Sequence, residues 1–326
     1  MLSLQGDYIC KYRTIISEYK IQFMSQLSPN TLSRHASTLE AEMSRLITVR
    51  QLDRWNAETL ILGGSYFRGS LLIELCEAFE VEAETALSAA LAVELIHNAS
   101  LIHDDIMDHD FERRGRPSGY AVLGASQALL FGDVLIAEAY DCLANLEIAS
   151  RSKVRLIQLL SQVILNASRG QSAQLDCESG MSCTLDACME WSRLKTGMLF
   201  ALPVEMALIL ADRERECKLA VSIGVEFGLA YQIMDDLFDC LGCKRGREKP
   251  SDNRNAEWTF ARVAERDFVG SEAVTMVAWM RECFMRIDTM KSVLPAATRM
   301  IFNEVERGMQ QQIDALLRAQ AKSERV

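Results

Sequence analysis

Proline is scarce in this sequence, with 5 residues in 326. Because proline interrupts helices, its scarcity permits many long ones. No linker rich in proline, glycine and serine divides the chain, so we expect one domain covering residues 1–326. Strand-type alternation of apolar and polar residues is also missing, whereas apolar residues recur at helical spacing. The sequence therefore predicts an all-α fold, a single large helical bundle.

An excess of basic residues is also lacking, because the formal net charge is -10. The absence of a basic stripe argues against a nucleic-acid partner. It does not exclude an anionic ligand, since a metal ion can bridge carboxylates to phosphate. No 18-residue stretch is free of charge, so we expect no transmembrane segment. The first residues, MLSLQGDYICKYR, lack the basic-then-apolar order of a signal peptide.

The 10 cysteines are scattered through apolar helical patterns. This distribution favours reduced thiols and a cytoplasmic protein. Cys240 and Cys243 form a lone CxxC without a second pair at zinc spacing, which is more typical of a helix end than of a metal site.

Apolar periodicity and turn residues together predict the positions of the helices. Gly63–Gly64 is a weak point in one of them, Pro203 should kink another, and residues 113–119 and 242–255 should be loops. The expected helices cover residues 3–27, 31–49, 57–78, 83–107, 127–146, 153–176, 185–211 and 215–241, followed by three more segments.

Two aspartate clusters with the same DDxxD spacing end two of these helices. The first and last aspartates of such a cluster lie one turn apart on one helix face. Neighbouring carboxylates repel by roughly 4 kcal/mol per close pair at an effective dielectric near 20. A cation is therefore expected, and Mg²⁺ fits because it prefers hard oxygen ligands and keeps positions for phosphate oxygens. The candidate metal ligands are Asp104, Asp105, Asp108, Asp235, Asp236 and Asp239.

Both helices that carry the clusters are apolar nearly all round, which is typical of the centre of a bundle. If they face each other, six carboxylates meet at one end of a central cavity. Facing helices with acidic residues are a known way for bundles to build metal sites.

The chain resembles the trans-isoprenyl diphosphate synthases, the polyprenyl synthetase family, in four stretches in the same order. These read ELIHNASLIHDDIMDHDFERRGRPS, GQ at Gly170–Gln171, LKTGMLF and YQIMDDLFD. The resemblance implies an isoprenoid synthase-like bundle that joins an allylic prenyl diphosphate to isopentenyl diphosphate, acts as a homodimer and uses Mg²⁺, with three ions per active site.

Roles for other residues follow from the resemblance. Arg113, Lys195 and Gln171 would bind the allylic diphosphate. Thr196 and Gln232 would stabilise the carbocation with their dipoles, and Asp104 and Asp105 would hold the metal needed for catalysis. The apolar helix faces would exclude water that could quench the cation.

The isopentenyl diphosphate site that the resemblance implies contains Arg68, His97 and Arg114. Three positions depart from the family pattern. Ser65 stands in place of a lysine, Gly69 in place of a proline, and Glu257 in place of a phosphate-binding lysine. These changes put the second diphosphate site in question.

The side chains one turn before Asp104 bear on product length. Ala99 and Ser100 occupy a level at which short-chain members of the family carry bulky aromatic residues. The small residues leave a shaft open, with Ile96, Leu129 and Phe131 as a candidate lower floor, and predict a product of C20 or longer.

Two alternatives stay open. A class I terpene cyclase on the same scaffold would ionise and cyclise a prenyl diphosphate without isopentenyl diphosphate, and Ser65 and Glu257 favour it. A non-catalytic partner subunit is a third hypothesis, which the two intact aspartate clusters oppose.

Overall fold

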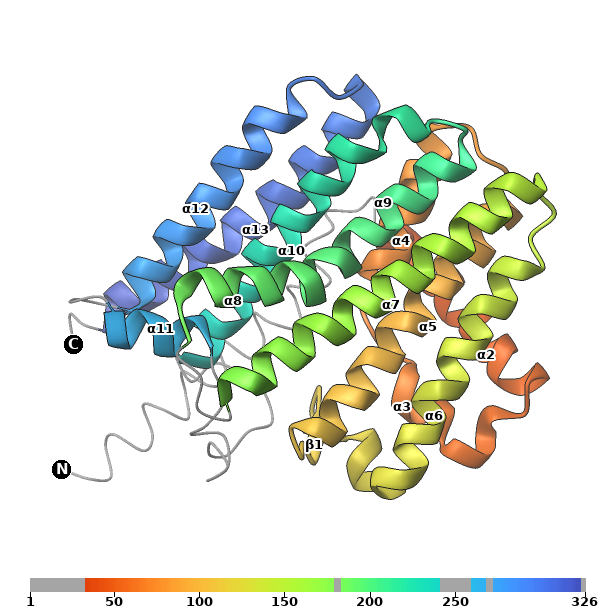
Figure 1. The fold of residues 1–326 in the computed structure, drawn as a ribbon, viewed down its shortest axis with the longest axis horizontal. Helices are drawn as coiled ribbons and strands as arrows, with labels where there is room; N and C mark the ends of the chain where they lie inside the picture. The colour runs from red at the N-terminus through yellow and green to blue at the C-terminus, as the bar shows by residue number, and fades with distance from the viewer. Residues whose placement is uncertain (1–32, 179–182, 241–258, 268–271, 324–326) are drawn as a thin grey trace.

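The computed structural model describes residues 33–178, 183–240, 259–267 and 272–323. Within them the chain is almost entirely helical, with one short two-stranded hairpin (Figure 1). The expected helix at 3–27, Cys243 and the expected loop at 242–255 lie outside the described residues. Glu257 also lies outside them.

The elements follow one another in a fixed order. They are α2 (Ser33–Val49), η1 (Leu52–Trp55), α3 (Ala57–Ile61), α4 (Phe67–Ala78), α5 (Ala83–Met107), β1 (Glu112–Arg113), β2 (Arg116–Pro117), α6 (Gly119–Ala144), α7 (Ser150–Glu178), α8 (Leu185–Ser192), η2 (Arg193–Gly197), α9 (Met198–Leu210), η3 (Glu214–Glu216), α10 (Cys217–Cys240), α11 (Phe260–Asp267), α12 (Glu272–Lys291) and α13 (Ala296–Ser323).

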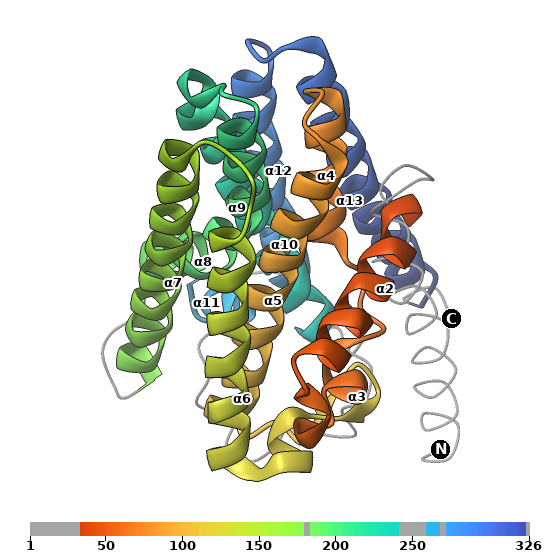
Figure 2. The same ribbon diagram turned by 90° about the vertical axis from the view of Figure 1, so that its right-hand side faces the viewer.

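Helix α5 has the predicted bounds and lies inside the bundle (Figure 2). It begins after Glu82, whose carboxylate accepts hydrogen bonds from the N–H groups of Glu84 and Thr85, which satisfies free donors of the first turn. Its apolar residues are buried against α4, α6 and α9. Helix α9 packs against both α5 and α10, so it lies at the base of the space between the two aspartate-bearing helices.

The helix expected at 57–78 is broken into α3 and α4. The break falls at the predicted weak point, where Gly63 has a φ of 77° and Tyr66 a φ of 51°. Glycine tolerates positive φ without steric cost, so the chain can turn there.

The loop expected at 113–119 is instead a β-hairpin followed by a helix. Glu112 pairs with Pro117 and Arg113 with Arg116. Arg114 and Gly115, the two turn residues, have φ values of 55° and 75°, as a two-residue hairpin turn with positive φ at both positions requires. Helix α6 begins at Gly119 with a short helical stretch, because the Ser118 hydroxyl caps it by accepting from the Ala121 N–H. Gly124, with a φ of 72° and a ψ of 163°, then kinks α6, so its long straight part begins close to the expected residue 127.

The helix expected at 185–211 is also divided. Pro203 lies inside α9, and the irregular turn lies earlier, where η2 forms one turn of π-helix between α8 and α9. Such wide turns often occur at functional sites. This one carries Lys195 and Thr196.

Three segments are long and apolar enough to cross a membrane by length and composition alone: α5, α6 and Glu214–Phe238. We expected no such segment because every 18-residue stretch contains a charged residue, whereas these three windows contain up to two. In α5 and Glu214–Phe238 most of the apolar window is buried inside the protein, 67% and 61%. Only 22% of the α6 window is buried, so α6 exposes an apolar face.

Candidate active site

One cavity of about 1450 Å³ lies between α5, α10, η2 and the hairpin. Asp104, Asp105 and Asp108 line it from the end of α5, and Asp235 and Asp236 line it from α10. Both clusters therefore border the same space. The backbone of Asp239 belongs to α10, but its side chain lies outside the described part of the structure.

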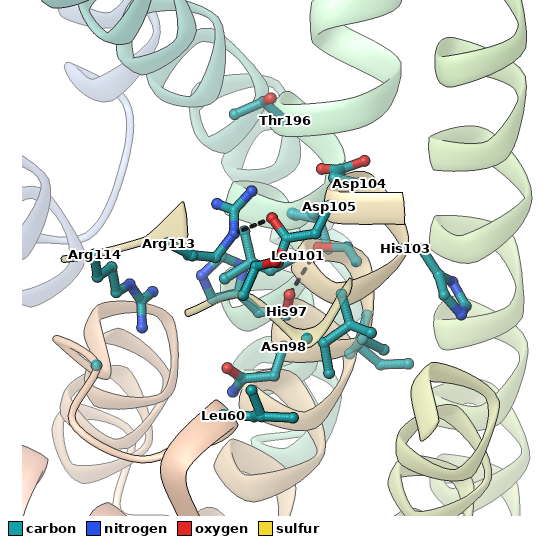
Figure 3. A pocket seen from close by; sticks show the side chains of 18 of the residues that line it. Leu60, His97, Asn98, Leu101, His103, Asp104, Asp105, Arg113, Arg114 and Thr196 are labelled. Carbon is teal, nitrogen blue, oxygen red and sulfur yellow. Dashed lines mark hydrogen bonds and ion pairs between the residues drawn. The ribbon is translucent and has the colours of Figure 1, made fainter. Parts of the chain in front are cut away.

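The first cluster is in contact with two cations, of which Figure 3 shows Arg113 beside Asp105. The Lys195 ammonium lies 3.3 Å from Asp104 Oδ1, and it also donates to Gln171 Oε1. The Arg113 Nε donates to Asp105 Oδ1 at 2.6 Å. Burial raises the pKa of Asp105 to about 6, although the charge of Arg113 opposes that rise.

The second cluster belongs to a chain of hydrogen bonds that links three elements. The Thr196 hydroxyl donates to Gln232 Oε1 at 2.8 Å, and the Gln232 amide donates to Asp236 Oδ1 at 2.9 Å. The backbone N–H of Phe260, at the start of α11, donates to Asp236 Oδ2 at 2.8 Å. Asp236 therefore fixes the side chain of Gln232 and the position of α11.

The residues of the predicted second diphosphate site lie at the other side of the cavity. Arg68 is buried at 5% exposure, with its guanidinium 3.3 Å from His97 Nε2 and over the ring of Phe200. Burial lowers the pKa of His97 well below its ordinary value, and the charge of Arg68 lowers it further, so the imidazole is neutral near pH 7. Among described residues, Arg68 Nε and His97 Nδ1 have no hydrogen-bond partner.

Glu94 is part of this site, although the sequence reasoning did not select it. It is 3% exposed, and its Oε1 accepts from the Gly69 N–H at 2.7 Å. Burial raises its pKa, against the opposing effects of that hydrogen bond and of Arg68. The sequence does mark Glu94, because it is a charged residue within the apolar run that precedes Asp104.

Two arginines of the hairpin lie against the loop that precedes α4, which contains Gly63 and Gly64 and is called the glycine loop below. A Cβ atom on Gly64 would lie 2.9 Å from Arg114 Nη1. One on Gly63 would lie 3.4 Å from Arg116 Nη1. Arg116 lines the cavity together with Ser65, and the sequence reasoning gave it no role.

The apolar part of the cavity lies below Asp104. Ile96, Ala99 and Ser100 line it as predicted. The predicted lower floor is wrong in two residues, because Leu129 is 50% exposed and Phe131 stacks on Trp55 away from the cavity. The residues that line this depth from α6, α7 and α9 are Ile136, Val163, Ile164 and Leu199.

The donor set suits a hard divalent cation, because the charged oxygens that border the cavity are carboxylates, those of the two aspartate clusters among them. The described aspartates of the two clusters do not bring three ligand atoms within 4.8 Å of one another. Among described residues, the group that does so is His35, Glu74 and Glu77, which lies on α2 and α4. The space between the two clusters leaves room for ligand oxygens between them.

Comparison with known proteins agrees with this geometry. The family model for polyprenyl synthetase matches residues 50–276. A short chain isoprenyl diphosphate synthase of Methanocaldococcus jannaschii is 34% identical over 62% of this chain and 62% of its own length. A (2E,6E)-farnesyl diphosphate synthase of Mycobacterium bovis is 34% identical over 67% of this chain and 61% of its own length. The alignments thus span about three fifths of these two relatives.

Solved structures share the fold. A polyprenyl synthetase from Streptomyces coelicolor superposes with a TM-score of 0.71 at 24% identity, covering 86% of this chain and 99% of that one. A heptaprenyl diphosphate synthase from Staphylococcus aureus gives a TM-score of 0.72 at 21% identity, covering 87% and 99%. With two aspartate clusters on one cavity and a family model that covers most of the chain, this protein belongs to the polyprenyl synthetase family.

Proposed function

We propose that this protein is a Mg²⁺-dependent trans-prenyltransferase that condenses an allylic prenyl diphosphate with isopentenyl diphosphate. The observation that carries the proposal is the convergence of Asp104 and Asp235, 131 positions apart in the sequence, on one cavity that is polar at one end and apolar at the other. A polar head group and an apolar chain of one substrate fit these two ends.

The aspartates that line the cavity are the proposed Mg²⁺ ligands: Asp104, Asp105, Asp108, Asp235 and Asp236, with Asp239 beside them in sequence. Asp105 and Asp236 also accept hydrogen bonds from Arg113 and Gln232, and so position these two side chains. Bound Mg²⁺ neutralises negative charge on the leaving pyrophosphate. The number of ions, three by family analogy, stays a prediction.

The residues around the clusters account for the first step. Lys195 and the remaining N–H groups of Arg113 donate to the allylic diphosphate as its C–O bond breaks, which stabilises the developing negative charge. Gln171 holds Lys195 in place. The oxygens of Thr196 and Gln232 direct their dipoles toward the carbocation without bonding to it.

The second step forms the new C–C bond. Arg68 and Arg114 hold the diphosphate of isopentenyl diphosphate, whose double bond attacks the cation. The proton lost from the resulting cation passes to the released pyrophosphate. His97 is neutral, so it orients Arg68 and can donate one N–H to the ligand, rather than contribute charge.

The depth of the cavity supports a product of C20 or longer. Its volume of about 1450 Å³ exceeds the roughly 300–1,000 Å³ of typical ligand pockets. Helix α5 itself carries no phenylalanine, tyrosine or tryptophan, so the aromatic residues that line the cavity, Phe67 and Tyr231, come from α4 and α10.

We further propose a homodimer that buries the exposed apolar faces of α6 and α7, which include Leu129 and Leu130. The described cysteines are all free thiols, in accord with the predicted cytoplasmic location. Cys76, Cys142, Cys177, Cys183, Cys188, Cys217 and Cys283 make up this set.

One assay tests the proposal and separates it from its alternatives. The protein is incubated with Mg²⁺ and C10, C15 or C20 allylic diphosphates, with and without isopentenyl diphosphate, and products are separated by chromatography. We expect a longer diphosphate only when both substrates are present, and elongation of the C15 primer. A cyclic hydrocarbon from the allylic substrate alone would identify a cyclase, which the uncharged Ser65 favours. No product would favour a non-catalytic subunit.

A further inference from the structure

The hairpin that follows α5 holds Arg116 against the glycine loop. Arg116 pairs with Arg113 across the two strands, and Arg113 is bound to the buried carboxylate of Asp105. The hairpin is also fixed at its base, where the Ser118 N–H donates to the Phe111 carbonyl at 3.0 Å. These contacts hold the backbone of Arg116 in place, although its side chain is exposed.

The guanidinium of Arg116 lies at the surface of Gly63. A Cβ atom there would be 3.4 Å from Nη1 and 3.6 Å from Nη2. The guanidinium of Arg114 lies against Gly64 in the same way. The two arginines thus occupy the side of the loop that the glycines leave open, and both line the cavity beside Ser65.

The charges at this end of the cavity do not balance within the described structure. Three guanidinium groups, those of Arg68, Arg114 and Arg116, lie beside two glutamates, the buried Glu94 and the exposed Glu112 of the hairpin. No ion pair joins Arg114 or Arg116 to any described carboxylate. Clustered cations repel one another, so a multivalent anion such as a diphosphate is the ligand that would stabilise them.

We propose that Arg116 binds the diphosphate of isopentenyl diphosphate and replaces the positive charge that Ser65 does not supply. This inference rests on the proposed function for the identity of the second substrate. It explains how a chain without lysine at position 65 can keep a three-cation site, because the third charge comes from the hairpin instead of the glycine loop.

Direct binding of isopentenyl diphosphate, measured by calorimetry without an allylic substrate, tests the assignment. Loss of one charge-assisted contact should raise the Kd about tenfold in Arg116→Ala. Arg116→Lys should keep the Kd within about threefold of the parent, because the charge is retained. The matched control is Arg45→Ala, which removes an exposed arginine paired with Glu42 on α2 and should leave the Kd unchanged.

A rescue variant separates charge replacement from damage to the hairpin. Ser65→Lys should lower the Kd of Arg116→Ala about tenfold, but change that of the parent less than threefold. In turnover, Arg116→Ala should raise the KM for isopentenyl diphosphate and leave the KM for the allylic substrate and kcat unchanged.

An unchanged Kd in Arg116→Ala would overturn the proposal, as would absence of rescue by Ser65→Lys or failure of the parent to bind isopentenyl diphosphate. If the parent binds it through Arg116 but elongates no allylic primer, the anion site stands and the transferase assignment fails.

Discussion

At the scale of single residues, the site depends on charged and polar groups that are buried together. Arg68 and Glu94 are buried and His97 is partly buried, and each has a polar partner: Arg68 and His97 contact each other, and Glu94 accepts from the Gly69 N–H. Such groups are costly to bury alone and become tolerable when paired. Burial, with a further contribution from the charge of Arg68, lowers the pKa of His97, and the nearby Glu94 opposes the effect of burial on the pKa of Arg68.

This burial makes His97 a source of acid sensitivity. Its pKa in the folded protein is well below 6.5, so below about pH 6.5 the unfolded chain binds a proton that the folded chain does not. Folding stability should therefore fall as the pH falls through this range, by up to about 1.4 kcal/mol per pH unit from this group. Replacing His97 with Gln should reduce the loss between pH 7 and 5.5, measured by urea unfolding. An equally steep loss in the variant would show that other groups are responsible.

The sequence predicted the site residues where a local pattern marks them. The DDxxD spacing identified Asp104 and Asp235, and the resemblance of LKTGMLF to the family identified Lys195 and Thr196; the structure brings all four to one cavity. It could not predict that Asp105 and Asp236 would be held by Arg113 and by the Phe260 N–H, because those contacts depend on packing between distant segments.

At the scale of elements, the π-helical turn η2 is held by a close helix crossing. A Cβ atom on Gly228 of α10 would lie 2.5 Å from the Cα of Gly197 and 2.8 Å from the Thr196 carbonyl oxygen. Because these are backbone atoms, no side-chain rotation could relieve the clash. The crossing therefore sets the distance between Thr196 and Gln232, which share a hydrogen bond.

Gly228→Ala should separate α10 from η2. We expect a loss of about 1–3 kcal/mol in the free energy of unfolding, typical of overpacking, and a lower kcat from displacement of Thr196. Gly132→Ala is a useful comparison, because its Cβ would meet only the ring of His103, which can rotate, so its effect should be smaller. Equal stability and kcat for Gly228→Ala and the parent would contradict this role.

Helix prediction succeeded for α5 because its apolar pattern continues without glycine or proline from Ala83 to Met107. It failed where backbone geometry outweighs periodicity. The Arg114–Gly115 turn forms a hairpin in a segment that reads as a loop, and Ser118 caps a short helical stretch ahead of the kink at Gly124 in α6.

At the scale of the whole molecule, α6 and α7 both carry exposed apolar residues. On α6 these include Leu129 and Leu130, and on α7 Val154 and Leu165 lie about three turns apart on one face. Exposed apolar patches of this kind mark contact surfaces. This spacing supports the homodimer proposed above.

Leu130→Glu should therefore dissociate the dimer, because a charge would be buried without a partner in the interface. Analytical ultracentrifugation should give twice the chain mass for the parent and the chain mass for the variant. Val293→Glu, at an exposed apolar residue between α12 and α13, is the control and should stay dimeric. A monomeric parent at all concentrations would rule out the interface.

The central claim is that the two aspartate-bearing helices act together on one diphosphate. The most direct measurement is Mg²⁺-dependent release of pyrophosphate from a C15 allylic diphosphate and isopentenyl diphosphate by the parent, Asp104→Ala and Asp235→Ala, with the exposed Asp186→Ala on α8 as control. We predict that each of the first two variants lowers kcat by about 100-fold or more, and that the control matches the parent. Full activity in either Asp104→Ala or Asp235→Ala would contradict a shared site.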